Sequence, residues 1–259
     1  MHELKLLNIG ILSWITFLPV LGMVVVLLLP KDKEKQIKWT SLGFVFVQLV
    51  LCVVAFALFN NSMPGINKLD SMQFIEKFKW IDVSGFTWTN RIIIEYFMAV
   101  DGISMPMVLL TGIISFIAVL ASFKTTGVDK ALKGYFALLL LLDTGMMGTF
   151  VTLDFFMFFI FWEIMLLPMY FLIGIWGGPR KIYAAIKFFL YTLFGSAFIL
   201  VVMLALYFSS KDVTTGVHTF NMISLMDPAN YIPGSLLAGS LTTARLLAYV
   251  ALFIGFAIK

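Results

Sequence analysis

The feature that most constrains this chain is the repetition of apolar runs, each close to twenty residues long. A helix needs about 20 mostly apolar residues to cross the hydrocarbon core of a bilayer. Hydrophobic residues make up 61% of the 259 residues and charged residues 12%, against roughly 45–50% and about 25% in soluble proteins. We therefore predict an integral membrane protein. The predicted spans are residues 6–29, 39–59, 103–123, 135–153, 154–176, 182–209 and 241–258.

These runs predict helices. They are continuous and do not alternate with period two, which excludes a transmembrane β-barrel. In lipid each run must satisfy its own backbone hydrogen bonds, and a helix does so. The first run is too long for a cleavable signal peptide, and Pro30-Lys31-Asp32 offers no small-residue cleavage site. The predicted fold class is an all-α integral membrane bundle of about seven transmembrane helices.

Several kinds of site are excluded. The single cysteine, Cys52, rules out an internal disulfide and a cysteine-held cluster. The two histidines, His2 and His218, lie outside the apolar runs, which argues against a haem held between helices. The basic residues sit in short gaps between spans, where they set topology, so no nucleic-acid partner is expected. We expect no cofactor in this chain.

The distribution of Lys and Arg predicts the orientation. The gaps after spans one, three and five hold nine basic residues, and the gaps on the alternate side hold six. Because basic residues in short loops favour the cytoplasmic side, we predict that the amino terminus lies outside. The nine are Lys31, Lys33, Lys35, Lys38, Lys124, Lys130, Lys133, Arg180 and Lys181.

The loop 60–102 is the longest polar stretch. Residues 79–83 and 86–89 flank Ser84-Gly85 and are typical of a small β-hairpin. We interpret it as an external surface loop without chemistry.

Glu163 is the sharpest candidate for function. An ionisable residue within a span costs roughly 2.5–3.5 kcal/mol on insertion scales, and Glu163 lies nine residues into span five, near the bilayer midplane. Pro168 lacks an N–H and frees the carbonyl of Ile164, so the helix is expected to loosen beside the carboxylate. The pattern favours proton or ion handling. The alternative is a neutral Glu163 hydrogen-bonded to a neighbouring helix.

Other charged residues also lie in or near spans. Lys187 could reach the interface or take part in function. Asp143, deep in span four, is either a hydrogen-bond acceptor or a functional group. Asp154 suits a helix amino terminus, and Arg245 suits an interfacial anchor.

Lys259 follows a long apolar run. A lysine at that depth beside Gly255 predicts a broken helix. Burial raises the pKa of a glutamate and lowers that of a lysine, and pairing of the two reverses both shifts. A Glu163–Lys259 pair could therefore change its protonation as its separation changes. The abrupt end of the run at Lys259 also predicts that the chain is a fragment or a truncated product.

The sequence around Glu163 resembles the M-type antiporter-like subunits of proton-pumping NADH:quinone oxidoreductase (complex I). The wider family includes the sister subunits L and N and chains of multisubunit Na⁺/H⁺ antiporters. The resemblance is carried by residues 161–174 (FWEIMLLPMYFLIG), 177–180 (GGPR) and 183–192 (YAAIKFFLYT), with support from 100–104 (VDGIS) and 253–259 (FIGFAIK).

The resemblance implies a fourteen-helix pump subunit with inverted five-helix repeats. Glu163 matches the family's helix-five glutamate, Lys259 its lysine at the break in helix seven, and Asp154 and Lys187 match polar positions of lesser weight. Residues 1–99 then form two helices plus the external loop. Residues 100–259 form helices three to seven, the start of the first repeat.

The function implied is proton translocation coupled to redox chemistry in other subunits. NADH, FMN, iron–sulfur clusters and quinone would be bound by those partners, with subunits L and N and the lipid bilayer as neighbours. The expected location is the cell's inner (plasma) membrane, as a multi-pass chain. The alternatives are a subunit of a Na⁺/H⁺ antiporter or membrane-bound hydrogenase, and a passive membrane scaffold.

Overall fold

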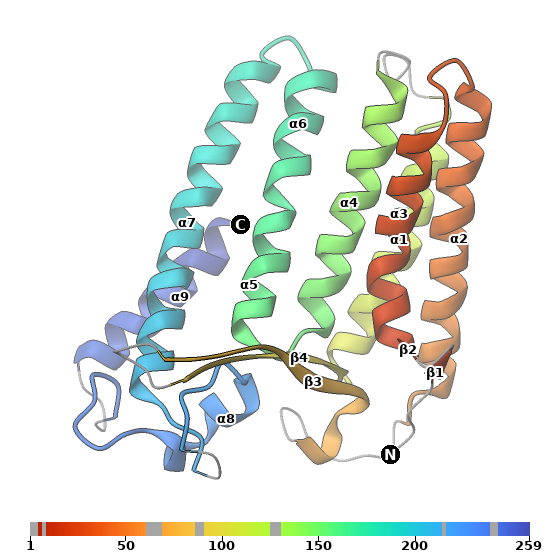
Figure 1. Ribbon diagram of the computed structural model, residues 1–259. Coiled ribbons are helices and arrows are strands. Elements are labelled where there is room, and N and C mark those ends of the chain that lie inside the picture. The colour runs from red at the N-terminus through yellow and green to blue at the C-terminus, as the bar shows by residue number, and fades with distance from the viewer. Residues whose placement is uncertain are drawn as a thin grey trace. The chain divides into compact units, whose positions relative to one another are not determined.

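The computed structural model is mostly helical (Figure 1). It describes residues 5–6, 9–60, 69–85, 91–124, 131–213, 216–238 and 243–259. The chain divides into two compact units, which are described separately. Unit 1 comprises residues 1–76, 98–151 and 161–187, and unit 2 comprises 77–97, 152–160 and 188–259.

Six apolar stretches within the described residues are long enough to cross a membrane. The seventh predicted span forms α9, Thr243–Ile258, which at 16 residues is shorter than the usual crossing length. The prediction of a polytopic helical membrane protein is confirmed. The six stretches are α1 Ile11–Leu28, α2 Glu34–Leu58, α3 Ser104–Ala121, α4 Leu132–Val151, α5 Phe155–Ile164 with α6 Leu166–Trp176, and α7 Lys181–Ser209.

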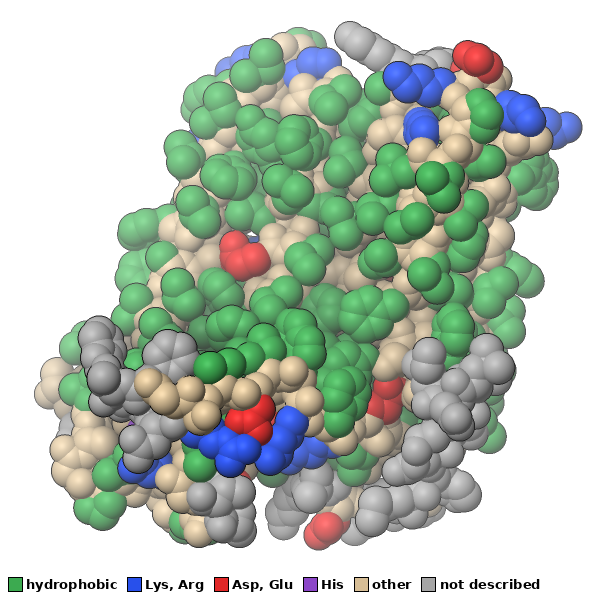
Figure 2. Space-filling model, viewed as in Figure 1, with side chains coloured by type: hydrophobic (Ala, Val, Ile, Leu, Met, Phe, Trp, Pro, Cys, Tyr) green, Lys and Arg blue, Asp and Glu red, His purple; other side chains and the backbone are tan. Residues whose placement is uncertain are grey.

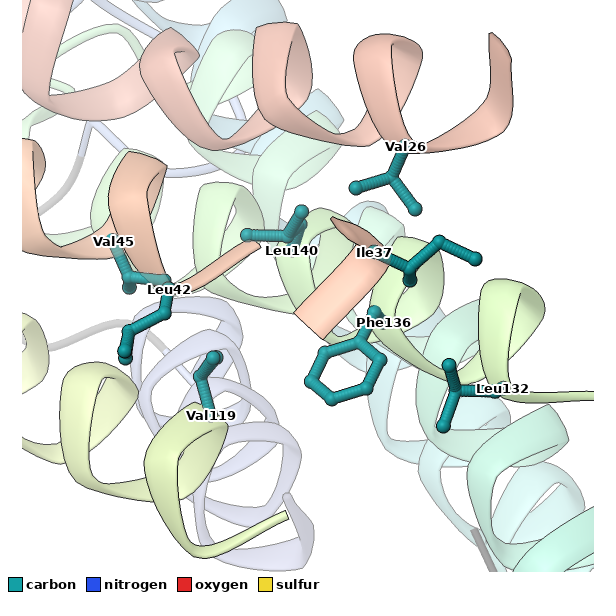
Figure 3. Packing of buried hydrophobic residues seen from close by; sticks show 8 residues of the cluster. All are labelled: Val26, Ile37, Leu42, Val45, Val119, Leu132, Phe136 and Leu140. Atoms are coloured by element: carbon teal, nitrogen blue, oxygen red, sulfur yellow. The ribbon is translucent and has the colours of Figure 1, made fainter. Parts of the chain in front are cut away.

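Helices α1 to α4 pack together in unit 1 around an apolar core (Figure 3). Each of the four contributes side chains, so the core holds together segments more than 100 residues apart in sequence. The core cluster consists of Val26, Ile37, Leu42, Val45, Val119, Leu132, Phe136 and Leu140.

The outward faces of these helices are also apolar. On α2, Phe46, Val50 and Val53 are each 44–52% exposed, whereas a helix on the surface of a soluble protein carries polar residues there. Figure 2 shows hydrophobic side chains over the middle of the helices and Lys and Arg towards their ends. This pattern fits helices surrounded by lipid.

The basic loops meet at one end of unit 1. Lys38 Nζ donates to the Phe123 carbonyl at 3.3 Å, and Lys133 Nζ donates to the Leu29 carbonyl at 2.8 Å. The rings of Tyr135 and Trp176 are 5.2 Å apart at the same end. The described ends of these basic loops therefore lie at the same end of unit 1; the side of the membrane that they face stays a prediction.

The hairpin is longer than predicted. Strand β3 runs from Gln73 to Ser84 and pairs with β4, Arg91–Val100. The expected second strand at 86–89 lies outside the described residues. The observed partner is rich in β-branched and aromatic residues, which suit strands.

The remaining elements are short. A two-stranded ribbon, β1 Lys5–Leu6 with β2 Ile9–Gly10, precedes α1. Helix α8 is Met222–Met226, and η1 Leu69–Ser71 and η2 Pro228–Asn230 are single 3₁₀ turns.

Candidate functional site

Glu163 lies at a break between two helices. Helix α5 ends at Ile164 and α6 begins at Leu166, so the span is interrupted at Met165. Pro168 has no N–H for the Ile164 carbonyl, as the sequence predicted. Glu163 is the ninth residue of the 22-residue span Phe155–Trp176. The predicted loosening beside a carboxylate near the middle of the span is confirmed.

The Glu163 carboxylate is incompletely satisfied within the described part of the chain. The side chain is partly buried, and its Oε1 atom is buried without a hydrogen-bond partner. An unpaired buried polar atom costs about 1–3 kcal/mol. The Oε1 atom is therefore open to a donor such as water, and the choice between proton handling and a structural role stays a prediction.

Two glycines let α4 approach the break closely. A Cβ on Gly148 would lie 2.2 Å from the Phe161 ring, and a Cβ on Gly145 would lie 2.5 Å from Met165 Cγ. Phe161 and Met165 flank Glu163 in sequence, so this contact fixes the helix on both sides of the carboxylate. The sequence analysis missed the pair, although small residues within a span are a recognised feature of close helix packing in membranes.

Asp143 is buried inside unit 1. It is 2% exposed, and its Oδ1 accepts a 2.7 Å hydrogen bond from Ser115 Oγ of α3. The predicted role as a hydrogen-bond acceptor is confirmed, and a functional role stays a prediction. The described residues show no ion pair for either Asp143 or Glu163.

Asp154, in unit 2, caps the amino terminus of α5. Its Oδ1 accepts from the backbone N–H groups of Phe156 and Met157, both at 3.0 Å, and its Oδ2 accepts from that of Glu95 at 3.1 Å. Asp154 is 0% exposed. The structural interpretation made from the sequence is confirmed.

Glu95 connects this cap to the rest of unit 2. Its Oε2 lies 3.0 Å from Lys77 Nζ and accepts from Asn221 Nδ2 at 3.0 Å. Asn221 in turn caps α8 by accepting from Ile223 N–H at 3.0 Å. Sequence reasoning missed this network because no local pattern links residues so far apart.

The two lysines of the predicted site lie in different units. Lys187, in unit 1, is exposed on α7 with its ammonium 5.8 Å from the Tyr183 ring centroid. Lys259, in unit 2, follows α9. The Glu163–Lys259 pair stays a prediction, because these residues belong to separate units. Arg245 lies 5.6 Å from the Tyr231 ring, which suits the predicted anchor.

Gly255 lies inside α9, which is helical up to Ile258. The helix is therefore not broken at the glycine, and a break at Lys259 stays a prediction. A Cβ on Gly255 would lie 2.6 Å from Ile199 Cγ1 and 2.9 Å from the Gly195 carbonyl oxygen. The glycine therefore allows α9 to pack closely on α7.

Residues 152–259 match the protein family described as NADH:quinone oxidoreductase/Mrp antiporter, transmembrane. This stretch of the chain, residues 152–259, carries a domain of that family. The chain is 38% identical over 220 residues to NAD(P)H-quinone oxidoreductase chain 4 1 of Nostoc sp., covering 84% of this chain and 38% of that protein. It is 31% identical over 260 residues to NADH-quinone oxidoreductase subunit M of Rickettsia prowazekii, covering 98% and 46%.

The chain thus spans less than half the length of these curated relatives. Among solved structures, it is similar to a chain of respiratory complex I from Thermus thermophilus, with a TM-score of 0.67, 20% identity, and 95% of this chain matched to 43% of that one. A chain of the Mrp complex from Dietzia sp. matches with a TM-score of 0.63, 16% identity, and 96% against 23%. These likenesses show the antiporter-like fold. The relatives in the NADH:quinone oxidoreductase/Mrp antiporter family are membrane subunits of multisubunit complexes.

Proposed function

We propose that this chain is part of a proton-translocating subunit of NADH:quinone oxidoreductase and that Glu163 binds and releases the transported proton. The observation that carries the proposal is the helix break at Met165 beside the Glu163 carboxylate, whose Oε1 is buried and unpaired within the described residues. The subunit names of its relatives support the choice of complex.

The break supplies the groups that proton transfer needs. The freed Ile164 carbonyl and the unpaired Glu163 oxygen are acceptors next to one another in the chain, and water is the donor that satisfies both kinds of atom inside a protein. A carboxyl group in contact with water takes up and releases protons. Moving one charge across 100 mV costs about 2.3 kcal/mol, so the proton affinity of the site must change by at least that order during the cycle.

Positive charges would produce this change. An ammonium close to a carboxylate favours the ionised acid, and its withdrawal favours the protonated one. Lys259 and Lys187 are the proposed cations, and Asp154 holds the start of α5 in place.

The redox chemistry belongs to other subunits in this proposal. NADH, FMN, iron–sulfur clusters and quinone bind there, and this chain contributes the membrane path. Its neighbours are the antiporter-like subunits L and N and the lipid of the cell's plasma membrane.

The test is redox-driven proton uptake by membrane vesicles that carry the complete subunit in its complex. Glu163→Gln keeps the shape of the side chain but removes the titratable proton, so uptake falls at least tenfold while assembly persists. Glu163→Asp retains more uptake than Glu163→Gln. Glu34→Gln, an exposed carboxylate at the start of α2, is the matched control and leaves uptake unchanged.

Full uptake by an assembled Glu163→Gln complex contradicts the proposal and leaves a passive scaffold. Uptake that requires Na⁺ and does not depend on NADH favours the antiporter alternative, which the description of the family also covers. Electron donation by hydrogen in place of NADH favours a membrane-bound hydrogenase.

A further inference from the structure

A proline in α1 creates an acceptor that α2 satisfies. Pro19 lies inside α1 and has no N–H, so the carbonyl of Ile15 lacks its helical donor. Gln48 of α2 donates to this carbonyl through Nε2 at 3.0 Å. The bond fixes the orientation of the Gln48 amide and leaves its Oε1 atom as a free acceptor.

Gln48 also reaches Asp143 of α4, whose carboxyl interacts with the Gln48 side chain. The opposite oxygen of Asp143, Oδ1, accepts from Ser115 of α3. Four helices of unit 1 therefore contribute to one polar network, in the order Ile15 carbonyl, Gln48, Asp143, Ser115.

The network is closed to solvent and short of hydrogen-bond donors. Asp143 is 2% exposed, and Gln48 is 0% exposed. Within the described residues, Asp143 Oδ2 and Gln48 Oε1 are buried without a hydrogen-bond partner. The amide oxygen of Gln48 can only accept a hydrogen bond, and so can both oxygens of an ionised carboxylate. The network therefore lacks a donor.

Within the described helices α1–α4, no basic side chain lies at the level of Gln48 and Asp143. Helices α1 and α3 contain no titratable residue, and the nearest basic residues on α2 and α4 are Lys38 and Lys133. Each lies ten residues from Gln48 or Asp143, about 15 Å along its helix, and each binds a carbonyl at the basic end of unit 1. The titratable group that interacts with Asp143 is Cys52 of α2. The neighbouring α5 and α6 carry Glu163 and Tyr170.

An ionised Asp143 would thus be a buried charge without a counter-ion, which is among the most costly arrangements in a protein. Protonation removes the charge. It also turns Oδ2 into an O–H donor, and this is the donor that the network lacks.

We propose that Asp143, Gln48 and Ser115 form a proton-binding site inside the α1–α4 bundle, with the proton on Asp143 Oδ2 and water completing the remaining hydrogen bonds. The site is distinct from Glu163. It does not depend on Glu163 carrying protons, so either proposal can fail while the other stands.

The test is infrared difference spectroscopy of the purified complex at pH 7. The spectrum of the wild type minus that of Asp143→Asn shows the C=O stretching band of a neutral carboxylic acid, shifted to lower frequency in D₂O. Gln48→Leu keeps Asp143 but removes its partner, so the band persists at a different frequency. This second variant locates the band even if Asp143→Asn does not assemble. Glu163→Gln leaves the band unchanged.

Carboxylate bands in place of the acid band, in both the Asp143→Asn and the Gln48→Leu comparisons, would overturn the proposal. Spectra recorded with and without Na⁺ show whether the site binds a proton or a metal cation. The acid band is expected to be the same in choline chloride and in NaCl. Its replacement by carboxylate bands in NaCl alone would show that the site binds Na⁺ and would also overturn the proposal.

Discussion

Glu76 of strand β3 accepts a 2.7 Å hydrogen bond through Oε1 from the backbone N–H of Leu12, in the first turn of helix α1. The backbone N–H and the hydroxyl of Ser13 donate to the same carboxylate. The residue before the helix, Gly10, has no side chain to cap it, and a Cβ there would lie 2.0 Å from Glu76 Cδ. A carboxylate 64 residues away in sequence thus satisfies the free N–H groups of α1 and its positive end.

Removing this cap should destabilise unit 1. Glu76→Ala leaves the Leu12 and Ser13 N–H groups without an acceptor, and the loss of a helix cap costs about 1–2 kcal/mol. The measurement is thermal unfolding of the purified protein in detergent. Asp32→Ala, at an exposed loop position, is the control and should leave the melting temperature unchanged. Equal melting temperatures for wild type and Glu76→Ala would contradict the capping role.

Stability should depend on pH through the same residue. Burial raises the pKa of Glu76 above its ordinary value of 4.5, although hydrogen bonds from Ser13 and Leu12 oppose the shift. Because the folded-state pKa is the higher one, the associated stabilisation is complete below pH 4.5 and is lost as pH rises through the folded value. The wild type should therefore lose stability relative to Glu76→Gln as pH rises from about 4 to 7. A melting-temperature difference that stays constant over this range would show that Glu76 does not titrate in this way.

The close approach of α4 to the α5–α6 junction can be tested with two glycines of the same helix. A methyl group at position 148 collides with the Phe161 ring, whereas at Gly134 the nearest atom is 3.9 Å away. Gly148→Ala should destabilise the protein by about 1–3 kcal/mol through overpacking, and Gly134→Ala should be neutral or slightly stabilising. Unfolding in detergent measures both. Phe161→Leu should restore part of the loss when combined with Gly148→Ala, and strictly additive effects would argue against direct contact.

Orientation in the membrane can be tested by labelling single cysteines on a Cys52→Ser background. Asp32 lies at the basic end of unit 1, and Asn60 follows the opposite end of α2. A membrane-impermeant thiol reagent added from outside should label Asn60→Cys and not Asp32→Cys, because the short basic loops are expected to face the cytoplasm. The reverse pattern would invert the predicted topology.

The parts of the fold that follow from local composition were predictable. The apolar runs predicted the positions of the spans, and Pro168 predicted the interruption next to Glu163. Both could be predicted because each depends only on residues within a single helix. The hairpin partner Arg91–Val100 was missed, although its composition favours a strand. A turn signal at Gly85 locates a hairpin but does not fix how far its second strand extends.

The parts that depend on contacts between distant residues were not predictable. Gly255 is a packing residue. This role is evident only from its close contacts with Gly195 and Ile199 on α7. In the same way, Gln48 gives no signal until the carbonyl that Pro19 frees is placed beside it. Asp143 was recognised because a carboxylate within an apolar span stands out in the sequence. Its partners Gln48 and Ser115 were not recognised, because uncharged polar residues do not stand out in this way.

The network around Asp154 has a consequence for the order of synthesis. The Phe97 carbonyl accepts from Leu153 N–H, the Leu153 carbonyl accepts from Met222 N–H, and Glu95 binds Asn221 across 126 residues. At about 5–20 residues per second, the ribosome needs roughly 6–25 s to make the intervening chain. Strand β4 therefore emerges long before α8 exists to complete its bonds. During that interval the Glu95 carboxylate and the Leu153 carbonyl lack the partners that Asn221 and Met222 later supply.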